Sequence, residues 1–553
     1  MRDPNLVKLL SRAGVVVMIT VPAIVYMAIL AMNSVNMPVG DDIGSIIGFL
    51  SRWHDSVRNG NLSIGPFFDQ FYSHRIPFTR LIVALQSTLL GQIDLRVLHV
   101  VSWIGWLLLL ATLVGRKWSA RNSHLWLVPV TLILMQPQGF TNFLIASGSP
   151  GHAWTILLAY WAIYLSKFNS KGAIGLAVLF GLGSAMCTVN GLLVFPAIVM
   201  GNVIRNNRPR AVLWSSMGVI IWILYLHGYS VSDQPIVYGL LSIWRLAFNS
   251  AVLAGAIGKF GTMGLGILAA FGCLLIIAAG LSCWRKGQDE DEFELTCLLS
   301  FLLLSILMIA FARGGWDAEY MEQDRYRLYG LILIAALYLT YADRWNLAER
   351  KVALAFAIGA ALFFNVSSYA QQYGDLRYSA NWARAAAMDI QIGNQMLLPP
   401  YEPKEIGQVT AMMRKVVSEG LYQPAKILTP SQLEQLRIMR NRDFPKPNRQ
   451  FRCVQSEAFG GYLFTPLGKT NRHGGDTPDF GVLFEDDIPI VVPVVINRAR
   501  FRDILVRRSF LSDDFGVVLT ANCFERGRHM LYGVKDQADS AFTVLWSSSV
   551  ECP

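Results

Sequence analysis

Long apolar runs, separated by short polar stretches, dominate the first two thirds of the chain. A helix of roughly 20 apolar residues crosses the hydrocarbon core of a bilayer, and about eleven segments meet this requirement. The expected spans are 13–32, 96–114, 124–140, 151–166, 172–187, 189–204, 211–228, 260–283, 294–312, 325–341 and 350–368. The pattern therefore predicts a polytopic α-helical membrane protein followed by a soluble C-terminal part.

The composition agrees with this class, because 53% of the 553 residues are hydrophobic and only 16% are charged. Basic residues gather at every second connection, on the same side as the N-terminus, so these ends are predicted to be cytoplasmic. These basic connections are Arg116/Lys117/Arg121, Lys167/Lys171, Arg205/Arg208/Arg210, Arg285/Lys286 and Arg344/Arg350/Lys351. An odd number of spans then places loop 33–95 and the tail outside the cytoplasm. The net charge of +10 comes mostly from the cytoplasmic loops, and nucleic acid is not implied.

The tail after residue 368 has the composition of a soluble protein. It shows two helical patterns, a proline-dotted linker and several β-type runs, which predict a small β-sandwich. The helices are Ser379–Ile392 and Ile406–Glu419, the linker is Phe444–Asn448, and the strands are Gly481–Phe484, Ile488–Ile496, Gly516–Thr520 and Ala541–Trp546. The predicted division is a membrane domain (1–368), a helical connector (369–450) and an extracytoplasmic β-rich domain (451–553). The last domain could bind carbohydrate, dock an acceptor or serve as a structural cap.

Three cysteines in the tail, Cys453, Cys523 and Cys552, allow one disulfide and one leftover thiol. The sequence leaves their pairing open.

The first external loop contains two amphipathic patterns, each preceded by charged residues. Asp41 and Asp42 precede an apolar stripe expected to lie in the membrane interface, and His74 and Arg75 precede a second one. The first stripe is Ile43, Ile46, Ile47, Leu50 and Trp53, and the second is Phe78, Leu81, Ile82, Leu85 and Leu89. Helix capping explains one of the two acids. Because neighbouring carboxylates repel each other, we expect at least one to be functional. His74 and Arg75 are candidates for function, or a solvated pair that contacts lipid head groups.

A second charged cluster is expected outside the cytoplasm, between Arg313 and Arg327. Arg325 and Arg327 run against the positive-inside trend, so a phosphate is a reasonable partner. The alternative is that Glu322 and Asp324 pair with these arginines. Nearby aromatic residues, including Tyr326, could stack on a sugar or simply lie at the membrane interface.

The order of these parts resembles the GT-C superfamily of integral membrane glycosyltransferases. The resemblance rests on GDD (Gly40–Asp42), SHRIPFTRLIVAL (Ser73–Leu85), GQIDLRVLHVVSWIGWLLLL (Gly91–Leu110) and the basic GRK (Gly115–Lys117). It covers roughly the first third of the chain by pattern and the remainder by topology alone. Several branches of the superfamily show a carboxylate at the second site, where this chain has His74 and Arg75, so the branch stays open.

The resemblance implies an inverting transfer of a sugar from a polyprenyl-phosphate carrier to an envelope glycan, lipid or protein. The reaction would take place on the periplasmic side of a bacterial inner membrane. Asp41 would be the general base, with Asp42 as the other candidate. Phosphate would be bound by Arg75, Arg325 and Arg327, and the acceptor or a metal would be oriented by His74 and Tyr326. A divalent cation at Asp42 and His74 is left open, and no cofactor is certain.

Two other functions compete with this one. A transporter or flippase of lipid-linked sugars would be expected to carry ionisable groups near the bilayer midplane. Here the charged residues gather instead at one face. A glycan polymerase or ligase would use the same kind of donor but would require a larger external cavity.

Overall fold

A computed structural model describes the chain at 4–71, 74–118, 124–230, 240–260, 263–286, 292–313, 318–342, 347–392, 403–439, 451–456, 461–466, 480–485, 488–498, 511–520, 527–536 and 542–552. These residues form two compact units. The first consists of Met1–Met32, Ser63–Ile82 and Leu98–Tyr369, and the second of Asn33–Leu62, Val83–Val97 and Ala370–Pro553. The segment 33–95, predicted to be the first external loop, therefore contributes to both units.

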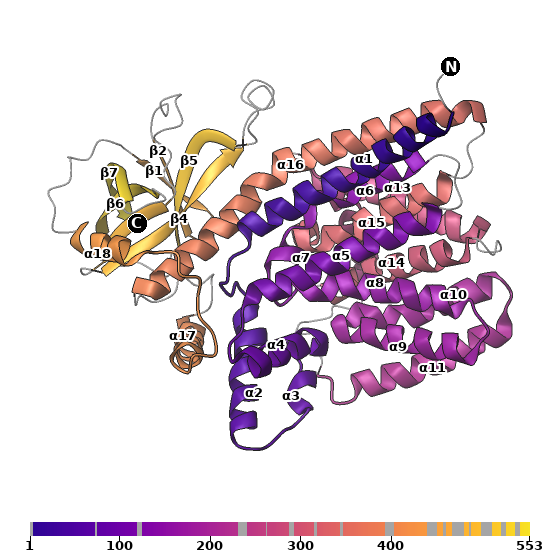
Figure 1. Cartoon of the computed structure of the whole chain (residues 1–553), viewed down its shortest axis with the longest axis horizontal. Coiled ribbons are helices and arrows are strands. Elements are labelled where there is room, and N and C mark those ends of the chain that lie inside the picture. The colour runs from indigo at the N-terminus through magenta and orange to yellow at the C-terminus, as the bar shows by residue number, and fades with distance from the viewer. Residues whose placement is uncertain are drawn as a thin grey trace. The chain divides into compact units, whose positions relative to one another are not determined.

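Six helices of the described chain are long and apolar enough to cross a membrane, which indicates a multi-pass membrane protein. They are α1 (Pro4–Asn33), α5 (Leu95–Trp118), α11 (Arg208–Leu226), α13 (Leu265–Lys286), α14 (Phe293–Ala312) and α16 (Leu347–Ile392). All six overlap spans predicted from the sequence. The longest, α16, has 46 residues and joins the last predicted span to the first predicted helix of the tail. Figure 1 shows α16 as one unbroken helix.

The remaining helices are shorter or less apolar. Those in or near the predicted spans are α6 (Val128–Leu134), α7 (Thr141–Leu144), α8 (Ser149–Ser166), α9 (Lys171–Cys187), α10 (Val194–Ile204), α12 (Leu240–Gly255) and α15 (Asp324–Tyr341). The prediction of one continuous span at 124–140 was wrong. The helix α6 has only 7 residues there and ends before Pro137, whose ring and missing N–H interrupt helical hydrogen bonding.

The helix α12 was not predicted, and it packs closely against α13. Gly255 on α12 faces the carbonyl oxygen of Leu268, and Gly272 on α13 faces that of Ala251, with no space for a Cβ atom at either glycine. Such small residues let two helix backbones approach each other closely. Elsewhere in the first unit α8 packs on α9, and α10 on α11, and these helices lie side by side in Figure 1.

The amphipathic stripe after Asp42 is buried in protein. It lies on the π-helical turn η1 (Ile43–Ile47) and on α2 (Gly48–Arg58), and Ile43, Ile46, Ile47 and Leu50 have no exposed surface. The helix α17 (Pro403–Ser418) packs on both elements, and its Met412 reaches Gly48. The expectation that this stripe faces the membrane was therefore wrong, because a later part of the chain covers it.

The second predicted stripe lies on α4 (Pro77–Leu90) and stays largely exposed. Leu81, Leu85 and Leu89 are 48%, 51% and 77% exposed, as an interfacial helix requires. The short α3 (Gly65–Phe68) precedes α4, and Arg80 of α4 donates hydrogen bonds to the carbonyl oxygens at the end of α3, including that of Phe67 at 3.1 Å.

The described β-structure is one antiparallel sheet of seven strands in the order β1-β2-β5-β4-β3-β6-β7. The strands are β1 (Phe451–Ser456), β2 (Gly461–Pro466), β3 (Phe480–Glu485), β4 (Ile488–Arg498), β5 (Leu511–Thr520), β6 (Gly527–Asp536) and β7 (Phe542–Cys552). The four predicted β-type runs fall on β3, β4, β5 and β7, so a β-rich C-terminal region is confirmed. Residues 488–493 of β4 pair with β3 and residues 494–498 pair with β5, so β4 joins the two halves of the sheet. The predicted linker at 444–448 lies outside the described residues.

The end of α16 is attached to β4 by side chains of the second unit. Oδ1 of Asp389, which is fully buried, accepts a hydrogen bond of 2.8 Å from the N–H of Val491. The strand β5 pairs with β4 only from Val494 onward, so Val491 lies beyond that pairing. Asp389 supplies the hydrogen-bond acceptor for the N–H of Val491. The short helix α18 (Pro430–Met439) also packs on β4.

Candidate functional site

The residues predicted for the site are divided between the two units. Asp41 and Asp42 belong to the second unit. The other predicted residues belong to the first unit and are His74, Arg75, Arg325, Tyr326 and Arg327.

Asp41 and Asp42 occupy one tight turn but have different environments. Gly40 adopts a φ of +55°, a conformation that favours glycine, and it directs the chain into the turn. Oδ2 of Asp42 accepts a hydrogen bond of 3.0 Å from the N–H of Val39, and Asp42 is only 1% exposed. The side chain of Asp41 is exposed, and its carbonyl oxygen accepts the hydroxyl of Ser45 at 2.6 Å. The carboxylate of Asp42 thus holds the turn together, although it makes no capping hydrogen bond to the helix that follows, and Asp41 presents its carboxylate to the surroundings.

His74 and Arg75 lie on a turn that is held against the end of α11. The N–H of His74 donates to the carbonyl oxygen of Phe71 at 2.9 Å, and the reciprocal bond measures 2.8 Å. The Arg75 guanidinium donates to the carbonyl oxygens of Tyr225 at 2.6 Å and His227 at 2.9 Å. These carbonyls lie at a helix C-terminus, where backbone acceptors lack helical partners and attract positive charge. Two of the Arg75 nitrogens are therefore engaged in attaching this loop to α11.

Arg325 lies among aromatic rings at the start of α15. Its guanidinium carbon is 5.4 Å from the ring centre of Tyr320 and 5.1 Å from that of Tyr326, and it also hydrogen-bonds the Tyr320 hydroxyl. Tyr320 belongs to the short helix η6 (Ala318–Glu322), and the guanidinium carbon of Arg313 lies 6.0 Å from the centre of the same ring. Two guanidinium groups thus share one aromatic residue, an arrangement that cation–π attraction supports.

Of the two acids beside these arginines, Glu322 has a different ion-pair partner, whereas Asp324 interacts electrostatically with Arg327 and Arg325, as the sequence suggested. Glu322 forms an ion pair with Lys259, and its carbonyl oxygen accepts a 2.9 Å hydrogen bond from Nε of Arg327. Arg327 is only 7% exposed. Oδ1 of Asp324 accepts the backbone N–H of Arg325 at 2.9 Å. Residues 314–317 of the predicted cluster lie outside the described residues.

His74 takes part in a cluster of basic side chains in the first unit. Burial lowers the pKa of His74 to about 3, and the neighbouring Arg313, His152 and Arg325 lower it further. The imidazole is therefore neutral at physiological pH. Its Nδ1 is shielded from solvent, and no hydrogen-bond partner for it occurs in the described part of the chain.

Sequence reasoning missed a polar network that joins this cluster to the helix interior. Nδ1 of His152 lies 3.3 Å from the hydroxyl of Tyr329, and Nδ2 of Asn190 donates to the same hydroxyl at 2.9 Å. Tyr329 is fully buried, so it exposes no ring face on which a sugar could stack. The break at Val189 to Asn190 in the apolar pattern was the only signal that could have pointed to this network.

The second unit contains a polar pocket that the sequence did not predict. Its volume is about 420 Å³, and it is lined by Asn36, Gln92, Ile93, Asp94, Arg96 and the segment Gln423–Lys426. The lining comes from three segments that are far apart in the sequence: the chain before Asp41, the turn before α5 and the chain after α17. The volume falls within the usual range for small-molecule sites, roughly 300–1,000 Å³.

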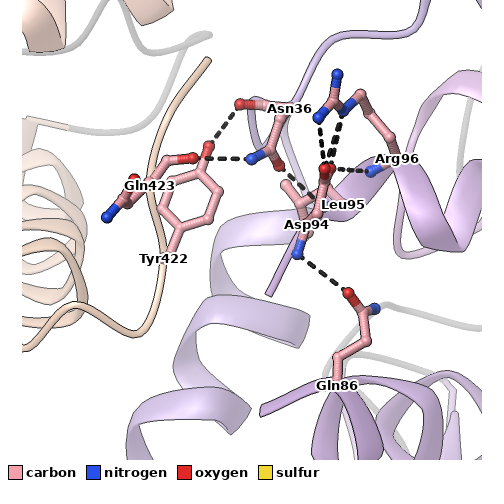
Figure 2. Close-up of polar contacts among 7 residues, drawn as sticks. All are labelled: Asn36, Gln86, Asp94, Leu95, Arg96, Tyr422 and Gln423. Atoms are coloured by element: carbon pink, nitrogen blue, oxygen red, sulfur yellow. Dashed lines mark hydrogen bonds and ion pairs between the residues drawn. The ribbon is translucent and has the colours of Figure 1, made fainter. Parts of the chain in front are cut away.

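Asn36 connects the three segments, as Figure 2 shows. Its Oδ1 accepts the N–H of Leu95 at 2.8 Å, and its Nδ2 donates to the carbonyl oxygen of Gln423 at 2.8 Å. The Asn36 carbonyl oxygen accepts the hydroxyl of Tyr422 at 2.8 Å and the N–H of Ala425 at 3.0 Å. Every one of these bonds fixes one wall of the pocket to another, so the pocket is formed without a ligand.

The pocket carries an excess of one positive charge. Asp94 accepts from Nε of Arg96 at 3.0 Å and from Nη2 at 2.6 Å, which balances one cation, and Lys426 adds a second. Tyr422, behind the wall, is fully buried. Burial raises the pKa of Tyr422 well above its usual value, and the negative charges of Asp94 and Asp42 raise it further. The turn at residues 41–42 is therefore electrostatically close to the wall of the pocket.

Within the described ranges, no group of three or more His, Cys, Asp or Glu side chains is arranged to hold a metal ion. The cation considered for Asp42 and His74 stays a hypothesis. Four cysteines of the membrane region are free thiols: Cys187, Cys273, Cys283 and Cys297. Cys523 lies outside the described residues, as do the side chains of Cys453 and Cys552.

Comparison with known proteins gives no relative from which a function could be transferred. No family model, no curated protein and no solved structure matches the chain.

Proposed function

We propose that the chain is a membrane glycosyltransferase of the GT-C type that moves a sugar from a polyprenyl-phosphate carrier to an envelope glycan, lipid or protein. In this proposal it crosses a bacterial inner membrane about eleven times. The reaction takes place on the periplasmic side, where the β-rich domain also lies. The anomeric centre is inverted.

The observation that carries the proposal is the basic and aromatic cluster around Arg325. Arg325, Arg313 and His74 interact electrostatically at the end of apolar helices, and two of them bear a full positive charge. Asp324 interacts with Arg325 and offsets part of this charge, but like charges repel, so an anion that lies between Arg313 and Arg325 would still gain from this environment. A phosphate attached to a membrane lipid supplies such an anion where these helices end.

The chemistry assigns different roles to the individual residues. The hydroxyl of the acceptor transfers its proton to Asp41 while its oxygen attacks the anomeric carbon. The bond from that carbon to the phosphate oxygen breaks, and the phosphate leaves with the electron pair. Arg325 stabilises the negative charge of the departing phosphate. Arg75 and Arg327 already donate to backbone carbonyls, which makes them better suited to positioning than to binding phosphate directly.

The exposure of Asp41 supports its choice over Asp42 as the base. An accessible carboxylate can receive a proton from an incoming alcohol, whereas the carboxylate of Asp42 is buried and hydrogen-bonded within the turn. His74 and Tyr326 remain candidates for orienting the acceptor or a metal.

The experiment measures consumption of a polyprenyl-phosphate sugar by the full chain in lipid nanodiscs. Asp41→Asn is expected to abolish transfer and Arg325→Ala to weaken donor use. Glu419→Gln and Arg245→Ala, which alter exposed charges elsewhere in the two units, are the matched controls. Unchanged turnover in Asp41→Asn removes Asp41 from the mechanism. A donor that is moved between leaflets but never consumed identifies a transporter instead.

A further inference from the structure

The pocket at Asn36 has lining groups with open hydrogen-bonding capacity. Neither the side-chain amide of Gln92 nor that of Gln423 is bonded within the described part of the chain, and the same holds for Nη1 of Arg96 and Nζ of Lys426. By contrast, both polar side-chain atoms of Asn36 and its carbonyl oxygen are engaged in joining the walls. The pocket thus combines a fixed frame with four side chains that can turn toward a ligand.

These groups are suited to a particular ligand chemistry. An amide both donates and accepts hydrogen bonds, as a sugar hydroxyl does, so Gln92 and Gln423 suit a ligand rich in hydroxyl groups. Lys426 and the remaining donors of Arg96 suit one negative group, because Asp94 already balances the other positive charge. Ile93, Pro424 and Ala425 offer apolar surface to the C–H face of a sugar ring. No aromatic side chain occurs among the described residues of the lining, so a stacked nucleotide base has no platform.

We propose that this pocket binds a sugar that carries one anionic group, and that this sugar belongs to the acceptor of the transfer reaction. The second half of the statement rests on the proposed function, whereas the binding itself does not. The position of the pocket supports its assignment to the acceptor. Asn36 is on the same short segment as Asp41, and Tyr422 interacts electrostatically with both Asp94 and Asp42.

Binding is tested on the full chain in nanodiscs by calorimetry and by ligand-observed NMR. The probes are glucuronic acid and glucose 6-phosphate, which carry the negative charge on a carboxylate or a phosphate. Glucose tests the hydroxyl groups alone, and acetate and inorganic phosphate test the charge alone. We expect both anionic sugars to bind more tightly than glucose and than the simple anions. The proposal is overturned if acetate and inorganic phosphate bind as tightly as the anionic sugars, or if neither anionic sugar binds.

Variants connect the binding to the pocket. Lys426→Met should weaken binding of the anionic sugars about tenfold, the effect of losing one charge-assisted hydrogen bond, and leave glucose unchanged. Gln92→Leu should weaken binding of all three sugars. Arg58→Met, which removes an exposed cation from α2 outside the pocket, is the matched control and should bind as the wild type does. Wild-type affinity in both pocket variants overturns the assignment.

The two proposals can fail separately. If Asp41→Asn binds the sugar normally but no transfer occurs in any form of the protein, the pocket stands and the glycosyltransferase function does not. If the wild type transfers sugar and Lys426→Met transfers it to an anionic acceptor at the same KM, the function stands and the pocket does not hold the acceptor.

Discussion

The hydroxyl of Tyr422 donates a hydrogen bond of 2.8 Å to the carbonyl oxygen of Asn36. Both residues are buried, with exposed fractions of 0% and 8%. Since the side chain of Asn36 also binds backbone atoms of Leu95 and Gln423, one asparagine holds together three parts of the second unit. The shape of the pocket depends on it.

Replacing Asn36 should therefore destabilise the second unit. Asn36→Ala leaves the N–H of Leu95 and the carbonyl oxygen of Gln423 without their partners, and we expect a loss of about 1–3 kcal/mol. Hydrogen exchange at 92–96 and 421–426 measures the loss locally. Gln423→Ala is the control, because only the backbone oxygen of Gln423 is bonded, and it should change stability by less than about 0.5 kcal/mol. Equal effects of the two variants would contradict the role given to Asn36.

Replacing Asp42 should lower the stability of the protein more than replacing the adjacent Asp41. Asp42→Ala removes the acceptor of the Val39 N–H and should cost about 0.5–1.5 kcal/mol, the net contribution of a typical hydrogen bond. Asp41→Ala should cost less, since its side chain is exposed. Thermal unfolding of the full chain in one detergent, with both variants side by side, measures the difference. A larger loss in Asp41→Ala would show that the roles are reversed.

His74 should make the first unit sensitive to acid. Its pKa is about 3 in the folded protein, against roughly 6.5 in an unfolded chain. Above pH 6.5 both states are neutral and His74 adds no pH dependence. As the pH falls from 6.5 toward 3, the unfolded state binds the proton first, so the free energy of unfolding decreases.

The variant His74→Gln should lose this acid-dependent decrease. The measurement is the Tm at several values between about pH 7.5 and pH 4.5, a window that brackets the ordinary histidine pKa. His54→Gln, on α2 in the other unit, is the control for losing a histidine. An identical Tm profile in wild type and His74→Gln would contradict the buried, neutral imidazole.

Asp389 should be essential to the attachment of α16 to the sheet. Asp389→Leu leaves the N–H of Val491 buried without an acceptor, and we expect a loss of about 1–3 kcal/mol. Asp389→Asn retains a side-chain oxygen and should lose less. Limited proteolysis of the β-rich region, compared across the two variants, measures the effect. Equal sensitivity of the leucine and asparagine variants would exclude the hydrogen bond as the cause.

Local patterns in the sequence predicted many elements correctly. Long apolar runs gave α1, α5, α11, α13 and α14, because a spanning helix needs little beyond length and apolarity. Alternating and β-branched residues located β3 and β4 within one or two residues. The exposed apolar face of α4 was also predicted from its spacing.

Features that depend on distant parts of the chain could not be predicted in this way. The spacing of Ile43, Ile46 and Ile47 shows that one face is apolar, but not that α17 covers it. Nothing near Asn36 or Tyr422 in the sequence signals their pairing, since a hydrogen bond between distant residues leaves no periodic pattern. The exposure of Asp41 beside the buried Asp42 likewise depends on the backbone turn at Gly40.

The bond from Asn36 to Gln423 joins residues 387 positions apart. Nearly the whole chain must therefore be synthesised, and the apolar helices inserted in the bilayer, before Asn36 can form its hydrogen bond with Gln423. Contacts of such long sequence separation form late in folding. A nascent or prematurely terminated chain that ends before residue 421 can have its helices in place and still be unable to recognise a ligand at this pocket.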